Sequence, residues 1–132
     1  MKIFLIGLLL CSSLFAKSYK QFAQEMSYET DYKVALQKAK EQKKDILFVM
    51  VANFCPWCQK FEKKVLNKKI VNAKIQEKYI PLILNREEKN FPKQFETPII
   101  PTMYFIDYKN ENITNKVVGY NKREKFLNII NK

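Results

Sequence analysis

Residues 46–58 read ILFVMVANFCPWC, an unbroken apolar run followed by two cysteines that are separated by two residues. The run 46–51 is rich in branched and aromatic side chains, which is typical of a β-strand covered on both faces. Cys55-Pro56 can begin a helix, because proline is tolerated in a first turn, where its missing N–H costs nothing. This stretch therefore predicts a central strand that ends just before Cys55 and Cys58 at the start of a helix.

Two cysteines at this spacing suit thiol–disulfide exchange. The reaction needs a thiolate that attacks and a second thiol close enough to resolve the mixed disulfide. At a helix start the Cys55 sulfur faces unpaired N–H groups and the positive end of the helix dipole, and both favour the thiolate. Cys55 is therefore the predicted nucleophile, and Cys58, one turn further in, is the predicted resolving thiol.

Other roles for the cysteine pair are less well supported. A purely structural bridge would close a very small loop and would constrain the unfolded chain little. Zinc usually needs four protein ligands, and the chain has no histidine and only one further cysteine, Cys11. Copper(I) can be held by two thiolates, so a copper- or haem-handling partner that uses the same pair stays an alternative, as does a non-catalytic binding module built on Trp57.

Composition limits the class of protein. The 132 residues, 47% of them hydrophobic, are enough for one domain with one core. The formal charge of +11 is spread along the sequence, which indicates a lysine-rich surface and allows weak contact with an anionic membrane surface. No dense basic stripe or groove-binding motif points to nucleic acid. The absence of histidine excludes Ser-His-Asp and Cys-His catalysis.

The first residues have the pattern of a secretory signal peptide over 1–16. Met1-Lys2 is a short positive start, 3–15 is largely apolar, and Ala16 is a small residue at which cleavage can occur. The apolar run is shorter than the roughly 20 residues that a membrane span needs, so an uncleaved inner-membrane anchor is the less favoured alternative. Cleavage would remove Cys11. We therefore expect an exported, periplasmic bacterial protein.

The rest of the chain alternates helix and strand patterns. Residues 17–29 are polar and aperiodic, so we expect a lead-in segment there, before a single domain over 30–132. Asn67 and the pair Asn121 and Glu124 resemble helix N-caps. The expected elements after the lead-in are a helix at 30–43, strands at 46–51, 80–84, 102–106 and 115–118, helices from 55 and over 70–79, and a final helix from about 121.

Four features, in chain order, make residues 30–132 similar to the thioredoxin-like family. They are the apolar run 46–52, the motif Cys55-Pro56-Trp57-Cys58, Ile100-Pro101-Thr102 before an apolar strand, and Val118-Gly119 before the last helix. The resemblance implies an α/β thioredoxin fold, with a central mixed β-sheet flanked by helices on both faces. It also implies a cis Ile100–Pro101 bond next to the cysteines, where the Ile100 backbone can pair with a substrate strand.

Details of the motif resemble particular branches of the family. Residues 58–63 are similar to the reducing domains that feed electrons to periplasmic thiol proteins. Pro56-Trp57 replaces the usual Gly-Pro, and an aromatic residue there resembles glutaredoxins. Val49 stands where many thioredoxins have a buried acid that helps to deprotonate the second cysteine, which leaves water or Glu62 for that task. We expect Trp57 on an exposed rim for protein substrates and Phe54 in the core.

The resulting prediction is a thiol:disulfide oxidoreductase that reduces disulfides in exported proteins, such as cytochromes or other metal-site apoproteins. Its electrons would come from a membrane thiol reductase, and its only redox group would be the Cys55–Cys58 disulfide, with no other cofactor and no metal. A disulfide oxidase or isomerase is the enzymatic alternative, because the two residues between the cysteines tune the potential over a range of about 150 mV.

Overall fold

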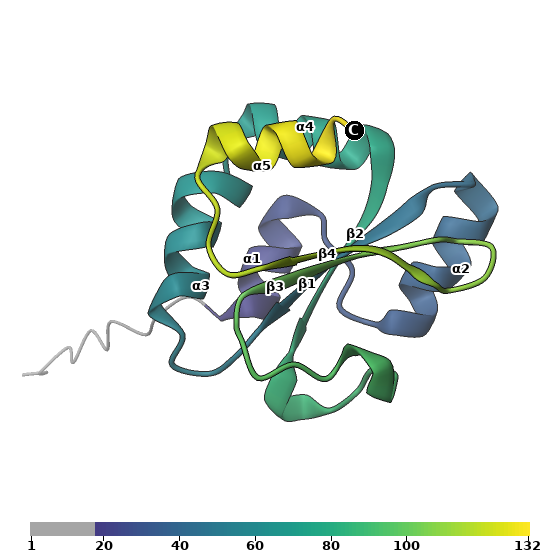
Figure 1. The fold of residues 1–132 in the computed structure, drawn as a ribbon, viewed down its shortest axis with the longest axis horizontal. Coiled ribbons are helices and arrows are strands. Elements are labelled where there is room, and N and C mark those ends of the chain that lie inside the picture. Colours follow the sequence, from purple (N-terminus) through teal and green to yellow (C-terminus); the bar gives the residue numbers. More distant parts are fainter. Residues whose placement is uncertain (1–17) are drawn as a thin grey trace, which may run out of the picture.

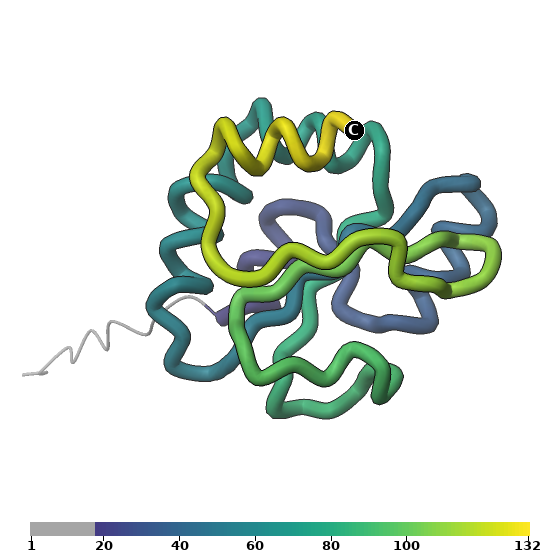
Figure 2. The backbone as a smooth tube through the Cα atoms, viewed as in Figure 1, coloured from purple at the N-terminus to yellow at the C-terminus, as the bar shows by residue number. Residues whose placement is uncertain are grey.

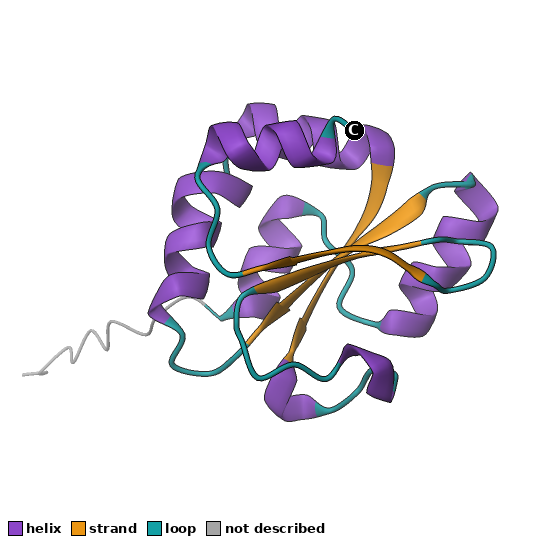
Figure 3. Ribbon diagram, in the orientation of Figure 1, coloured by secondary structure: helices purple, strands orange, loops and turns teal. Residues whose placement is uncertain are grey.

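The computed structural model describes residues 18–132, which form a four-stranded mixed sheet with helices on both faces (Figures 1 and 3). The strands are β1 (Asp45–Val51), β2 (Tyr79–Asn85), β3 (Thr102–Ile106) and β4 (Ile113–Val118). Their order across the sheet is β2-β1-β3-β4. β1 is parallel to β2 and antiparallel to β3, and β3 is antiparallel to β4. The expected mixed sheet is confirmed.

The helices divide unequally between the two faces, and the tube in Figure 2 traces the path between them. The longer elements are α1 (Tyr19–Met26), α2 (Tyr32–Gln42), α3 (Pro56–Phe61), α4 (Lys69–Lys78) and α5 (Arg123–Ile130). The short ones are a π-helical turn, η1 (Glu62–Leu66), and two 3₁₀ turns, η2 (Arg86–Glu88) and η3 (Lys93–Phe95). One face of the sheet packs against α1, α3, α4 and α5, whereas the other packs against α2 and the η3 segment.

The central strand explains why its sequence is continuously apolar. Leu47, Val49 and Val51 point into the core under α1, α3, α4 and α5. Ile46, Phe48 and Met50 point into the second core, under α2. Successive side chains of a strand alternate between faces, so a strand covered on both sides needs apolar residues at every position.

Residues 19–26 form a helix, so the expectation of an irregular lead-in there is wrong. α1 buries Phe22 and Ala23 in the core, and the Phe22 ring lies edge-on to Tyr28 at 5.3 Å. The chain then adds a bridge to the outer edge of β2, where Glu29 donates to the Pro81 carbonyl at 2.8 Å and accepts from the Ile83 amide at 3.0 Å. α1 is therefore part of the folded domain, which begins before residue 30.

The strands and most helices lie close to their expected places, but the two proposed N-caps are wrong. α4 and α5 start after Lys68 and Lys122, and neither has a side-chain cap. Asn121 is instead buried, and its side-chain amide donates to the Gly119 carbonyl at 3.2 Å. The asparagine thus stabilises the turn that precedes the helix.

The proposed signal peptide over 1–16 lies outside the described residues and stays a prediction. Within 18–132, no helix has the length and apolar character needed to cross a bilayer.

The burial of α1 leads to a stability prediction. Phe22→Ala should lower the free energy of unfolding by about 3–5 kcal/mol, because it removes an aromatic ring from a packed core. Val34→Ala, at a more exposed site on α2, is the control and should change it by less than about 0.5 kcal/mol. Urea denaturation measures both. Equal stability of the Phe22 variant and the parent would show that α1 does not belong to the cooperative fold.

Candidate active site

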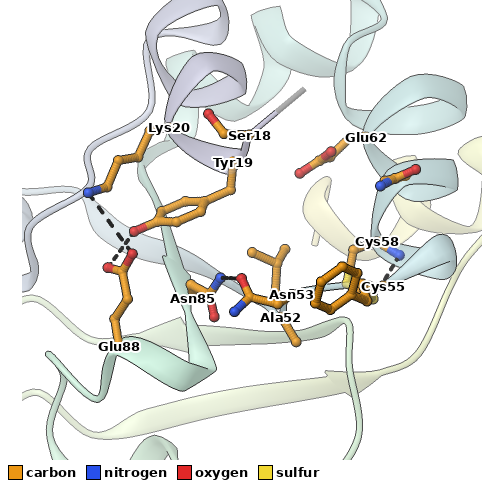
Figure 4. Close-up of a pocket in the computed structure, with 13 residues that line it drawn as sticks. Ser18, Tyr19, Lys20, Ala52, Asn53, Cys55, Cys58, Glu62, Asn85 and Glu88 are labelled. Carbon is orange, nitrogen blue, oxygen red and sulfur yellow. Dashed lines mark hydrogen bonds and ion pairs between the residues drawn. A yellow bond between two sulfur atoms is a disulfide. The ribbon is translucent and has the colours of Figure 1, made fainter. Parts of the chain in front are cut away.

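The two cysteines lie at the junction between β1 and α3, joined as a disulfide with sulfurs 2.12 Å and Cα atoms 5.2 Å apart. Cys55 is the N-cap of α3, and Pro56 is the first residue of that helix. The Cys55 sulfur accepts a hydrogen bond from the Cys58 amide at 3.1 Å (Figure 4). An N–H group and the positive end of the helix are thus directed at Cys55, and both would stabilise a thiolate in the reduced protein.

The surroundings of the two sulfurs differ. Cys58 is only 3% exposed and belongs to the core, whereas Cys55 is partly exposed at the core's edge. A partner molecule can therefore reach Cys55 more easily than Cys58. This is the asymmetry that a nucleophile and a resolving thiol require.

Phe54 is fully exposed, so its expected place in the core is wrong. The chain leaves β1 through a turn in which Phe54 takes a left-handed conformation, with φ of 51°. This backbone conformation is uncommon for a bulky residue, and it accompanies a side chain that points away from the core. Phe54 precedes Cys55 directly, so a large apolar surface lies next to the cysteine pair.

Trp57 lies on the other side of Cys55 and is 56% exposed. Its ring is 5.7 Å from that of Tyr120, and the Lys60 amine lies 4.9 Å from the Trp57 ring centroid and 5.1 Å from that of Tyr120. These contacts hold the indole in place by stacking and cation–π attraction. They also connect the motif to the segment that follows β4.

Strand register brings the distant Pro101 segment to the same end of the sheet. Thr102 is opposite Met50 on β1 and Val118 on β4, so Pro101 and Gly119 lie level with Val51, the last residue of β1. The Ile100–Pro101 peptide bond is cis. Gly119, with φ of 84°, donates its N–H to the Pro101 carbonyl at 2.7 Å, a left-handed conformation that glycine adopts without penalty.

Two further contacts hold this segment. The Thr102 hydroxyl donates to the Ile99 carbonyl at 2.6 Å, and the half-buried Ile100 packs against both cores. Ile99 projects outward and is exposed. Of the predicted residues, Pro101 and Gly119 are thus hydrogen-bonded to each other at the cysteine end of the sheet, and Ile100 directly precedes Pro101.

A cavity of about 460 Å³ opens beside the disulfide (Figure 4). Most of the residues that line it were not predicted from the sequence. α1 supplies Tyr19 and Lys20, and the Tyr19 hydroxyl donates to Glu88 at 2.5 Å. Burial, with this hydrogen bond, raises the pKa of Tyr19, so the phenol stays protonated. Across the floor the Asn85 amide donates to the Asn53 side chain at 2.7 Å. Polar side chains from α1, β2 and η2 therefore line part of a cavity that also borders apolar core residues.

Glu62 also lines this cavity, together with Cys55 and Cys58. The side chain is 9% exposed, which is unusual for a carboxylate. Val49, where the family resemblance places an acid, is fully buried among apolar neighbours. Among the described residues, no cluster of three or more His, Cys, Asp or Glu side chains could hold a metal ion.

Comparison with known proteins places the chain in a family. It belongs to the thioredoxin-like domain family, whose model matches residues 32–132. It is also 25% identical over 120 residues to an uncharacterized protein of Borreliella burgdorferi. That match covers 90% of this chain and 52% of the relative, so the chain spans about half the length of that protein.

Solved structures share the fold at low identity. A thioredoxin from Thermus thermophilus aligns with a TM-score of 0.67 and 19% identity, covering 77% of this chain and 82% of its own. The oxidoreductase DsbH aligns with a TM-score of 0.67 and 14% identity, covering 78% of this chain and 80% of its own. The oxidised C-terminal domain of DsbD from Neisseria meningitidis aligns with a TM-score of 0.62 and 16% identity, covering 79% of this chain and 97% of its own. The expected thioredoxin fold is confirmed.

Proposed function

We propose that this protein is a thiol:disulfide oxidoreductase that reduces disulfides in exported proteins through Cys55 and Cys58. The observation that carries the proposal is the position of Cys55, whose sulfur caps α3 and is partly exposed while its partner is buried. The family membership and the named oxidoreductases among the structural neighbours support the same chemistry.

The proposed reaction has two exchange steps. The Cys55 thiolate attacks one sulfur of the substrate disulfide, and the other substrate sulfur leaves as a thiolate. The Cys58 sulfur then attacks Cys55, which releases the substrate's second thiolate and leaves the Cys55–Cys58 disulfide. Two electrons pass from the dithiol to the substrate. A membrane thiol reductase, the proposed electron donor, restores the dithiol by the same exchange in reverse.

We propose that the substrate is a protein segment and not a small thiol compound. Phe54, Trp57 and Ile99 expose apolar surface around the cysteines, and we call these three side chains the apolar rim. Ile100 lies in the segment that is held by the Pro101–Gly119 hydrogen bond, where its backbone could pair with an extended substrate strand. Apolar contact and strand pairing together would align a substrate disulfide with Cys55.

The reducing direction is part of the proposal, and the Ile100-Pro101 pair, which resembles that of reducing family members, supports it. The DsbD domain, solved in oxidised and reduced forms, is a neighbour that occupies both states. Disulfide oxidation or isomerisation is the alternative outcome. No metal-handling role is favoured by a particular feature of the described site.

Trapping tests the function. A Cys58→Ser variant expressed in the source cells should accumulate mixed disulfides with exported proteins through Cys55, because the resolving thiol is missing. Cys55→Ser is the matched control and should trap far less, since it keeps only the buried cysteine. Gel mobility with and without reductant, followed by mass spectrometry, identifies the adducts. Equal trapping by both variants, or none by Cys58→Ser, would contradict the proposal.

The apolar rim leads to a specificity prediction. Phe54→Ala should lower kcat/KM for a protein disulfide about 5- to 30-fold, which corresponds to about 1–2 kcal/mol of lost apolar contact. Reduction of a small disulfide reagent should change less than about twofold. Ile70→Ala, an exposed apolar site on α4, is the control. If the Phe54 variant reduces both substrates more slowly by the same factor, the side chain affects the cysteines and does not recognise the substrate.

Export is proposed from the pattern of residues 1–16, with the periplasm of a bacterium as the location and weak contact of the lysine-rich surface with the membrane. Cleavage after Ala16 should give a mature protein that begins at Lys17. Intact mass measurement of the protein from the cell envelope checks this. Retention of Met1 in a membrane fraction would favour the uncleaved anchor instead.

A further inference from the structure

The resolving step requires a base close to Cys58, because a buried thiol is harder to ionise than an exposed one. Cys58, the third residue of α3, points into the core that α1 also lines. The central strand offers only Leu47, Val49 and Val51 to this face, and none of them can accept a proton. The acceptor must therefore come from a helix or from water in the cavity.

Glu62 is placed for this task by the helix itself. Its backbone N–H donates to the carbonyls of Cys58 and Gln59, so the chain is helical between the two residues. Residues four apart in a helix lie on one face, one turn above each other. Both side chains line the cavity beside the disulfide, and Figure 4 shows the Glu62 carboxylate directed into that cavity. The π-helical turn η1 also begins at Glu62, and such turns are frequent at functional sites.

Glu62 also lies between two cavities. A smaller cavity of about 160 Å³ is lined by residues of α1 and of the α3–η1 helix, including Gln59 and Glu62. These two side chains are common to both cavities. A carboxyl at this position can exchange protons with Cys58 on one side and with solvent on the other.

The titratable groups near Glu62 or around the two cavities come from α1, the loop after α1, η1 and η2. The Tyr28 hydroxyl is buried and has no hydrogen-bond partner within residues 18–132, and burial together with the charge of Glu62 raises the pKa of this tyrosine. Tyr28 therefore stays neutral. Glu25 and Lys63 line the smaller cavity, and the remaining charged side chains around the larger cavity are Lys20 and Glu88. Glu62 is the carboxyl that borders both cavities and lies one turn from Cys58.

We propose that Glu62 accepts the thiol proton of Cys58, directly or through one water, as Cys58 resolves the mixed disulfide. The inference rests on the proposed function. The Cys58 S–H bond breaks and the proton passes to the Glu62 carboxylate. The Cys58 sulfur bonds to the Cys55 sulfur, the Cys55–substrate bond breaks, and its electron pair leaves on the substrate sulfur. When the disulfide is reduced again, Glu62 returns the proton to Cys58.

The test separates the two exchange steps by stopped flow. The reduced protein is mixed with an aromatic disulfide that releases one coloured thiolate on attack by Cys55 and another on resolution by Cys58. Glu62→Gln should keep the rate of the first phase within about twofold of the parent's rate. It should slow the second phase about a hundredfold near pH 6. The deficit should shrink as pH rises toward and above the ordinary thiol pKa of about 8.5, because a growing fraction of Cys58 then ionises without the carboxylate. Glu62→Asp should recover part of the rate.

Controls distinguish failure of this inference from failure of the function. Glu88→Gln removes a carboxylate from the far wall of the same cavity and should leave the second phase unchanged. If the parent protein releases no second thiolate, the proposed function itself fails. If it does, and Glu62→Gln resolves at the parental rate at every pH, Glu62 is not the acceptor. Equal slowing of both phases would also overturn the inference.

A second measurement needs no change at Glu62. In a Cys55→Ser variant, the alkylation rate of Cys58 followed from about pH 4 to about pH 9 should show two inflexions, one for the carboxyl and one for the thiol, because coupled groups titrate together. A Cys55→Ser, Glu62→Gln double variant should show one. A single inflexion in the Cys55→Ser protein would contradict the proposal even if Glu62→Gln did not fold.

Discussion

The site depends on the burial of β1 on both faces and on its pairing with strands on both edges. Seven residues of β1 match β2, and five match β3 in the opposite direction. Side chains of β1 pack alternately into the two cores. The strand ends at Val51, and the chain then turns toward Cys55. The antiparallel strand β3 places Pro101 at that same end, and the residue after β4, Gly119, donates its N–H to the Pro101 carbonyl. Pro101 and Gly119, which follow Cys55 by about 45 and 65 positions in the sequence, are thus brought to the same end of the sheet by strand pairing.

One helix then gives the two cysteines different chemistry. Its first turn exposes Cys55 to the Cys58 amide and to the positive end of the helix dipole, which favours charge on that sulfur. The same first turn carries Cys58 into the core, where charge on sulfur is disfavoured. A further turn brings Glu62 to the cavity that borders both. The rise of the helix therefore arranges a partly exposed sulfur, a buried sulfur and a carboxyl in sequence, and α1 lines the opposite side of the cavity.

Much of this arrangement could be predicted from local sequence because it rests on local rules. A continuously apolar strand and proline in a first helical turn follow from local rules, the spacing of the two cysteines favours thiol exchange over the other roles considered, and the family resemblance added Pro101 and Gly119. The misses have different causes. α1 carries Tyr19, Phe22, Ala23 and Met26 at the i, i+3, i+4 and i+7 spacing of an amphipathic helix, so this helix could have been recognised from the sequence. The exposure of Phe54 depends on its left-handed backbone conformation, which the residue types around it do not predict. The burial of Glu62 depends on packing with α1 and so was beyond a local pattern.

The claim that most needs a direct test is that this dithiol serves as a reductant. The potential of the Cys55–Cys58 pair can be measured by equilibrating the purified protein with glutathione buffers and quantifying the oxidised fraction. If the pair supplies electrons to substrate disulfides, we predict a value close to that of thioredoxins, about −270 mV, or at least below about −200 mV. A value near −120 mV, typical of a strong disulfide donor, would contradict the account and identify the protein as an oxidase.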